Sequence, residues 1–316
     1  MANSQFQIFQ SSDGGAPTLN GTSGSLIAVL DYCLTGSTTG WTRTFTSSSS
    51  GTVVRAMYQQ ASGSRMFFNI QDDALLTSKE ARIFGFETGS SQDTGSRQFP
   101  LSGQGVPSGY GYVVTRKSTT IDATARAWIV FADTSTVYFF CITGDSAGTY
   151  TGFFFGDIYS LKGPSDAYRC IIAGRTSENA AGTGNDTIPV LSGIASVVNG
   201  HYMARTYGGG GSSITVGKHG DGVKGSTTVL AGTTQYPNGV DGTIYMAPIW
   251  VHENASSTVR GRLRGWYQIC HAITNFTDGD TLNGSSTLVG RTFQLIKTNG
   301  NNGIFCLETS ATVETN

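Results

Sequence analysis

The sequence predicts a mostly β protein built from two antiparallel β-sandwich-like parts, with one short N-terminal helix. Glycine accounts for 43 of 316 residues, about twice its usual frequency, so tight turns must be common. Between the glycine-rich segments lie short runs of β-branched and aromatic residues, which favour strands. These runs follow one another with little helix between them, and this spacing favours antiparallel pairing over β-α-β units.

The length of the chain favours two domains over one. We expect an N-terminal β-rich domain over residues 1–175 and a C-terminal β-rich domain over residues 200–316. Residues 176–199 are polar and rich in Gly, Ser and Thr, which predicts a linker or a long loop. No internal repeat is visible, so neither a propeller nor a solenoid is expected.

Residues 25–34 form the best helix candidate. Ser25 can cap the N-terminus of this helix, and Gly36 can end it. The apolar residues that share one helical face are Leu26, Leu30, Cys33 and Leu34. We expect this short helix to plug one end of a sheet.

Most of the remaining chain is predicted as short strands. Residues 127–131 are apolar on both faces, which suits the middle of a two-layer sandwich. The short turn over residues 132–136 predicts a hairpin between strands 126–131 and 136–142. The other predicted strands cover residues 6–9, 41–45, 53–59, 65–71, 80–87, 112–116, 150–155, 167–173, 201–207, 213–216, 243–251, 259–267, 292–297 and 303–308.

The charge of the chain argues against nucleic acid as a partner. The net charge is −1, and a nucleic-acid-binding face would need an excess of Lys and Arg. The densest basic run is Arg260, Arg262 and Arg264, whose spacing of two places them on one strand face. We expect that face to be solvated or to form intersubunit salt bridges, with phosphate or lipopolysaccharide binding as the alternative.

No membrane insertion or secretion is expected. No apolar run reaches the roughly 18 residues of a membrane helix, and residues 1–6 lack the features of a signal peptide. The number of cysteines is odd and no C-x-x-C pair occurs, so we expect reduced, unpaired and buried thiols made in a reducing cytosol. They are Cys33, Cys141, Cys170, Cys270 and Cys306.

No catalytic constellation is predicted. Residues 211–218 resemble a phosphate-binding loop, but five residues separate the glycines and His219 follows the lysine, where Ser or Thr should bind magnesium. Asp278 and Asp280 flank a glycine and are expected to bond their own turn rather than calcium. His252 with Glu253, like His219 with Asp221, could belong to a metal site only if other segments completed it. We predict no catalytic residue, no cofactor and no bound metal.

Two sets of apolar residues are candidate contact sites. Tyr207 precedes four glycines and Tyr236 lies in a Pro-Asn-Gly loop, so both rings can be exposed for contact with a partner or a glycan. Phe6, Ile8 and Phe9 form a candidate assembly contact, because terminal segments are disordered unless something holds them.

The last quarter of the chain carries a recognisable pattern. Residues 259–271 read VRGRLRGWYQICH, residues 276–281 read FTDGDT, residues 288–297 read LVGRTFQLIK and residues 303–310 read GIFCLETS. This pattern resembles the C-terminal part of virion structural proteins of tailed bacteriophages. The likeness continues through segments 6–17, 122–133 and 157–170, so it covers most of the chain.

The resemblance implies a non-enzymatic structural component of a tailed phage virion, in the tail, baseplate, neck or head appendages. Such a protein is assembled in the cytoplasm of the bacterial host. Low charge and poorly guarded sheet edges favour a homo-oligomer, first of all a trimer, docked on other virion proteins. The alternative is a receptor-binding or tail-fibre-like module that contacts host surface glycan. A glycan depolymerase is the third possibility.

Overall fold

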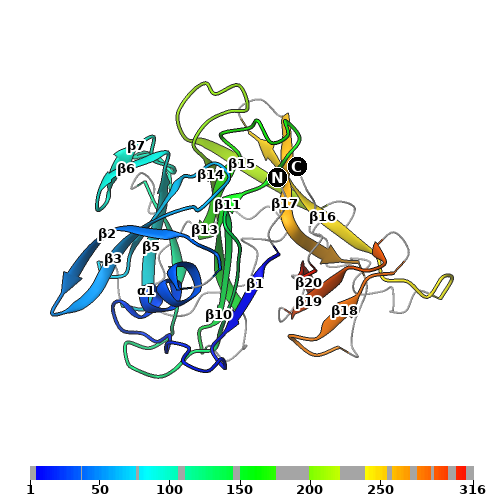
Figure 1. Ribbon diagram of the computed structural model, residues 1–316, viewed down its shortest axis with the longest axis horizontal. Coiled ribbons are helices and arrows are strands. Elements are labelled where there is room, and N and C mark those ends of the chain that lie inside the picture. The colour runs from blue at the N-terminus through cyan, green and yellow to red at the C-terminus, as the bar shows by residue number, and fades with distance from the viewer. Residues whose placement is uncertain are drawn as a thin grey trace.

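A computed structural model describes residues 5–36, 38–75, 78–105, 111–144, 150–175, 199–220, 239–254, 258–270, 276–285, 288–297 and 304–310. As predicted, the protein is mostly β, with one short helix and a large antiparallel sheet. The strands are arranged in three layers (Figure 1).

The first layer holds the strands that follow the helix, in the order β2-β3-β4-β5-β8. Each strand pairs antiparallel with the next. A small hairpin of β6 (Thr88–Ser91) and β7 (Thr94–Ser96) follows β5. The layer consists of β2 (Thr42–Ser49), β3 (Thr52–Gln59), β4 (Phe67–Gln71), β5 (Glu80–Phe86) and β8 (Val113–Arg116).

The middle layer has the order β1-β9-β10-β11-β13-β14. The predicted hairpin between strands 126–131 and 136–142 is confirmed, since β9 and β10 pair with Ala132 opposite Val137. The layer consists of β1 (Gln7–Gln10), β9 (Trp128–Ala132), β10 (Thr136–Ile142), β11 (Tyr150–Asp157), β13 (Cys170–Arg175) and β14 (Asn199–Met203).

The third layer has the order β15-β16-β17-β20-β19-β18, and the short β12 (Tyr159–Ser160) also pairs with β17. Its strands are β15 (Ile214–Gly220), β16 (Met246–Glu253), β17 (Thr258–Ile269), β18 (Thr281–Asn283), β19 (Thr292–Lys297) and β20 (Ile304–Glu308). The segment 213–216, predicted as a strand and not as a phosphate loop, is confirmed as strand by β15.

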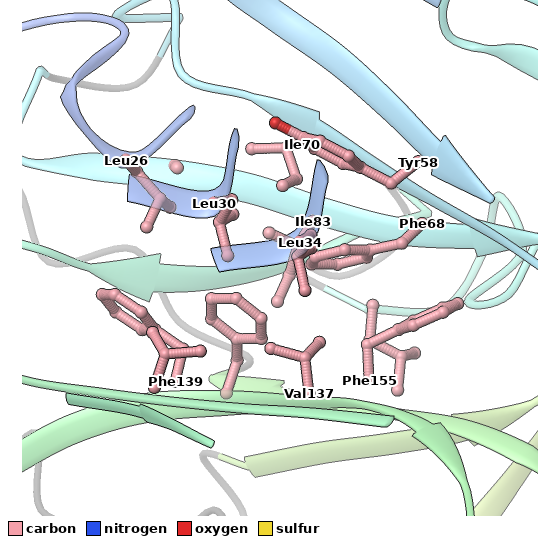
Figure 2. Close-up of a cluster of buried hydrophobic side chains, with 14 of the residues drawn as sticks. Leu26, Leu30, Leu34, Tyr58, Phe68, Ile70, Ile83, Val137, Phe139 and Phe155 are labelled. Carbon is pink, nitrogen blue, oxygen red and sulfur yellow. The ribbon is translucent and has the colours of Figure 1, made fainter. Parts of the chain in front are cut away.

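The central strands of the middle layer, β9, β10, β11 and β13, are buried on both faces. Their side chains alternate between the two faces. On β10, Phe139 packs into the cluster shared with the first layer, whereas Tyr138 and Phe140 pack into the cluster shared with the third layer. Figure 2 shows Val137, Phe139 and Phe155 pointing up toward the helix and the strands of the first layer. The apolar character of residues 127–131 on both faces thus reflects a sheet covered on each side.

Two separate sandwiches are not confirmed, because strands pass from one layer to the next. At the end of β13, Arg175 pairs with Val114 of the first layer. In β15, Thr215 pairs with Tyr202 of the middle layer, while Val216 already pairs with Glu253 of the third. The predicted boundary, residues 176–199, lies outside the described residues except for its last residue, which opens β14.

The predicted helix over residues 25–34 is present but changes geometry halfway. An α-helix, α1 (Ser25–Leu30), continues as a π-helical turn, η1 (Asp31–Thr35), and Gly36 follows as predicted. The four apolar residues of the expected face are all buried in the cluster between the first and middle layers. The helix therefore packs against the interior between two layers.

The cap of this helix differs from the prediction. Ser25 does not cap it: the Ser25 hydroxyl donates to the Asn20 carbonyl at 2.9 Å. The cap comes from Asp72, whose carboxylate accepts from the Leu26 amide at 3.0 Å. The buried Lys117 ammonium pairs with the other Asp72 oxygen. A carboxylate far away in sequence thus replaces the local hydroxyl, and the lysine compensates its buried charge.

Candidate functional site

A pocket of about 240 Å³ opens on the outer face of the first layer. This face points away from the helix and from the middle layer. The pocket combines a guanidinium, a carboxylate, two amides and two aromatic rings. Its lining residues are Gln71, Arg82, Phe84, Asp93, Gln98, Gly111 and Tyr112.

Strand register assembles the floor of this pocket. Gln71 of β4 lies directly opposite Arg82 of β5, and Arg82 lies opposite Val114 of β8. Residues two apart on a strand share a face, so Phe84 joins Arg82, and Tyr112 joins Val114. Three adjacent strands therefore deliver the floor side chains to one place.

The β6–β7 hairpin forms a wall because glycines let it approach the sheet closely. Gly89 and Gly95 lie opposite each other in the hairpin. A Cβ at Gly89 would lie 2.6 Å from the Met57 sulfur and 2.8 Å from the Phe67 ring, and one at Gly95 would lie 2.7 Å from the Phe86 ring. Side chains at these two positions would lift the hairpin off the sheet.

Asp93 fastens the tip of the hairpin to the sheet. Its carboxylate accepts from Arg55 Nη1 at 2.5 Å, from Asn69 Nδ2 at 2.8 Å and from Gln92 Nε2 at 2.9 Å. Burial alone would raise the pKa of Asp93, but the hydrogen bonds from Gln92, Asn69 and Arg55 outweigh it and hold the pKa below its ordinary value. Asp93 is therefore a fixed anion.

Arg82 is the cation that lines the pocket. The guanidinium lies over the Tyr112 ring, 4.4 Å from the ring centroid. Among the described residues it has no carboxylate partner, and its buried Nε has no hydrogen-bond acceptor. By contrast, Arg55 pairs with both Asp73 and Asp93. The pocket thus offers an uncompensated donor beside aromatic and amide groups.

The predicted assembly contact at the N-terminus is part of the middle layer. Phe6 is buried in the cluster between the middle and third layers and meets Tyr138 edge-on at 5.7 Å. Phe9 packs on the other cluster against Tyr32. Only Ile8 is exposed, at 36%. Pairing of β1 with β9 holds this segment in place.

The two predicted loop aromatics have different outcomes. The Tyr207 side chain is 50% exposed, and the Tyr207 amide donates to the Glu253 carboxylate at 2.6 Å, which anchors the loop. Tyr236 lies outside the described residues. The pocket lies on the first layer, whereas Tyr207 lies in the connection between β14 and β15.

The expectation of a solvated arginine face is wrong for Arg260 and Arg264, which are both buried. Arg260 pairs with Glu253 and Asp166 within the same chain. Arg264 is covered by the β9–β10 turn through its pair with Asp133, and most of β17 beyond Val259 is buried. The carboxylates that neutralise these arginines come from distant segments and could not be read from local spacing.

Arg262 is half-buried and lies over two rings, 4.7 Å from the Tyr159 centroid and 5.8 Å from the Trp250 centroid. The three arginines therefore serve ion pairs and ring contacts inside the chain. This arrangement removes the reason for expecting phosphate or lipopolysaccharide binding at the run.

The aspartates that the sequence offered as candidate calcium ligands make contacts within the protein. Asp280 accepts from the Thr277 amide at 2.7 Å, which confirms the turn, and Asp278 accepts from the Tyr150 hydroxyl. Within the described ranges, no group of three or more His, Cys, Asp and Glu side chains is placed to hold a metal. His271 and Asp221 lie outside those ranges. All five cysteines are free, four of them buried and Cys270 half-buried.

Sequence reasoning missed every residue of the pocket. The local signals are three predicted strands: residues 80–87, where Arg82 and Phe84 share a face, and residues 65–71 and 112–116, which contain Gln71 and Tyr112. No spacing rule links those strands to Asp93 or Gln98, because the hairpin must first fold back onto the sheet.

No protein-family model matches this chain, and no curated protein matches it. Across the part of the chain that the structure describes, no helix has both the length and the apolar character needed to cross a bilayer. Its fold and pocket define it as an antiparallel β protein with three layers of strands and a small pocket, lined by polar and aromatic side chains, on the outer face of the first layer.

Proposed function

We propose that this protein is a non-enzymatic structural component of a tailed bacteriophage virion, in the tail, baseplate, neck or head appendages. The observation that carries the proposal is the middle layer, whose central strands are buried on both faces and which is tied to the third layer by the buried Arg264–Asp133 ion pair. Such a frame resists deformation, as a building block must. The likeness of the sequence to phage virion proteins is the other support.

The two sandwich-like parts belong to the same proposal. Each interior cluster, together with the two layers that flank it, forms one part, and the middle sheet is shared between both. The first part holds the helix and the pocket, and the second holds the C-terminal pattern. A shared sheet would keep the two parts in one orientation within a particle.

We further propose a homo-oligomer, a trimer first of all, that docks on other virion proteins after assembly in the host cytoplasm. Only 13% of the residues are charged, which gives weak protection against association. The strand β2 pairs with β3, and its residues are exposed apart from the half-buried Phe45. Ile8 on β1 adds an exposed apolar side chain at another sheet edge.

Two measurements test this function. Mass spectrometry of purified phage particles should detect the protein in fixed stoichiometry with other virion proteins. Light scattering of the pure protein should give a mass above the 33.3 kDa monomer, with about three times that mass for a trimer. A monomer at micromolar concentration that is absent from particles would overturn the proposal.

A second candidate function is contact with host surface glycan, and the pocket favours it. Aromatic rings beside planar polar side chains are suited to the apolar faces and hydroxyl groups of a sugar. A glycan array and competition of phage adsorption by free polysaccharide test this function. Release of reducing sugar in the same samples would instead support a depolymerase.

A further inference from the structure

We infer that the pocket on the outer face of the first layer binds one acidic sugar unit, whose carboxylate pairs with Arg82. The inference rests on the second candidate function, contact with glycan, and names the chemical class of the glycan. It follows from the charges, the size and the surfaces of the pocket.

The hydrogen-bond donor of Arg82 that no described group satisfies points to an anion. Asp93 also lines the pocket, but its carboxylate is already engaged by Arg55, Asn69 and Gln92. Arg55 in turn donates from Nε to Asp73 at 2.6 Å. Arg55, Asp73 and Asp93 together carry one net negative charge, and their charged atoms are engaged with one another and with the amides. None of the described groups accepts from the buried Nε–H of Arg82. A carboxylate from a ligand would accept from that donor and pair with the guanidinium.

The same carboxylate of Asp93 selects among anions. A phosphate group carries about −1.5 to −2 charges at neutral pH, whereas a sugar carboxylate carries one. Because Asp93 remains ionised beside the site, repulsion grows with the charge of the ligand. A monoanion is therefore favoured over a phosphate.

The remaining walls suit a sugar ring. Phe84 and Tyr112, each 5% exposed, close the floor with apolar ring edges, and Gln71 and Gln98 place amides beside them for hydroxyl groups. Gln98 is oriented by donation from its Nε2 to the Gly111 carbonyl at 2.6 Å. The volume of about 240 Å³ lies below the roughly 300–1,000 Å³ of pockets for drug-sized ligands, which fits a single sugar unit.

The test compares charged with neutral ligands, with glucuronate and its methyl ester as the matched pair. Calorimetry and ligand-observed NMR with the full chain would use glucuronate, its neutral methyl ester, glucose, N-acetylneuraminate and inorganic phosphate. We expect at least one of the two acids to bind about tenfold or more tightly than the neutral sugars. Binding of the acid should weaken as salt is added.

Variants then assign the effect to one side chain. Arg82→Gln keeps a planar polar group but removes the charge, and it should abolish the preference for the acid. Arg43→Gln removes an arginine from the neighbouring β2, away from the pocket, and should leave binding unchanged. The unfolding midpoints of both variants show whether they are folded. If Arg82→Gln does not fold, the comparison of glucuronate with its methyl ester in the unaltered protein still tests the inference.

The outcomes separate the two proposals. If neutral sugars bind as tightly as the acids, or if Arg82→Gln keeps the preference, the acidic-sugar inference fails while glycan contact stands. If phosphate binds as tightly as the acids, the pocket is a general anion site and the inference also fails. If no sugar binds and the glycan array is silent, glycan contact and the inference fail together.

Discussion

Arg264 of β17 forms a buried ion pair with Asp133, in the turn between β9 and β10, at 2.7 Å between Nη2 and Oδ2. The same guanidinium donates to the Ser135 hydroxyl at 3.0 Å and to the Thr136 hydroxyl at 3.1 Å. β17 belongs to the third layer and the turn belongs to the middle layer. The pair therefore fixes the position of one layer on the other.

Replacing Arg264 by Met should destabilise the protein by about 3–5 kcal/mol, because the buried Asp133 carboxylate would lose its counter-ion. Urea denaturation at pH 7 measures the free energy of unfolding. The matched control is Arg43→Ala, which removes a more exposed pair with Asp31 and should cost about 1 kcal/mol or less. Equal losses in the two variants would contradict a cross-layer role for Arg264.

Replacing Phe139 by Ala should cost about 3–5 kcal/mol, because it opens a cavity in the cluster of Figure 2. Phe139 is fully buried and stacks on Phe153 with ring centroids 5.1 Å apart. Val289→Ala, at a side chain that is 74% exposed, should change stability by no more than about 0.5 kcal/mol. Thermal unfolding followed by circular dichroism compares the two variants.

The stabilisation that Asp93 provides should decrease at acidic pH. Its pKa is lower in the folded state than in the unfolded state, near 3.9, so its contribution is fully present above that value and is lost as the pH falls through the folded pKa. The difference in unfolding free energy between the protein and Asp93→Asn should be constant between about pH 5 and 7 and should shrink toward about pH 3. A difference that is unchanged or larger at about pH 3 would refute the role of Asp93 as an anionic clamp.

The thiols should differ sharply in reactivity. Burial raises the pKa of Cys33, Cys170 and Cys306, which suppresses the reactive thiolate. With a thiol reagent at about pH 8, Cys270 should react first, and the four buried cysteines should react only after denaturation. Mass spectrometry without reduction should show five free thiols. An intramolecular disulfide would contradict both the structure and the expected reducing site of synthesis.

Local pattern was enough for most of the longer strands, but the short strands β6, β7, β12 and β18 were not predicted. The hairpin of β9 and β10 follows from two apolar runs separated by a short turn, and each feature acts over only a few residues. The apolar face of the helix and its end at Gly36 were predictable for the same reason. The cap at Asp72 was not, because that carboxylate lies 46 residues beyond Leu26.

By itself, the sequence determined that this chain forms many short antiparallel strands and one helix, because turn residues and apolar alternation act between neighbours. Only the tertiary structure decided that one sheet is covered on both faces, that Arg260 and Arg264 are buried, and that no carboxylate in the described part of the chain pairs with Arg82. Each of these depends on which distant segments come together. Burial and charge compensation are properties of that packing, and no local spacing encodes them.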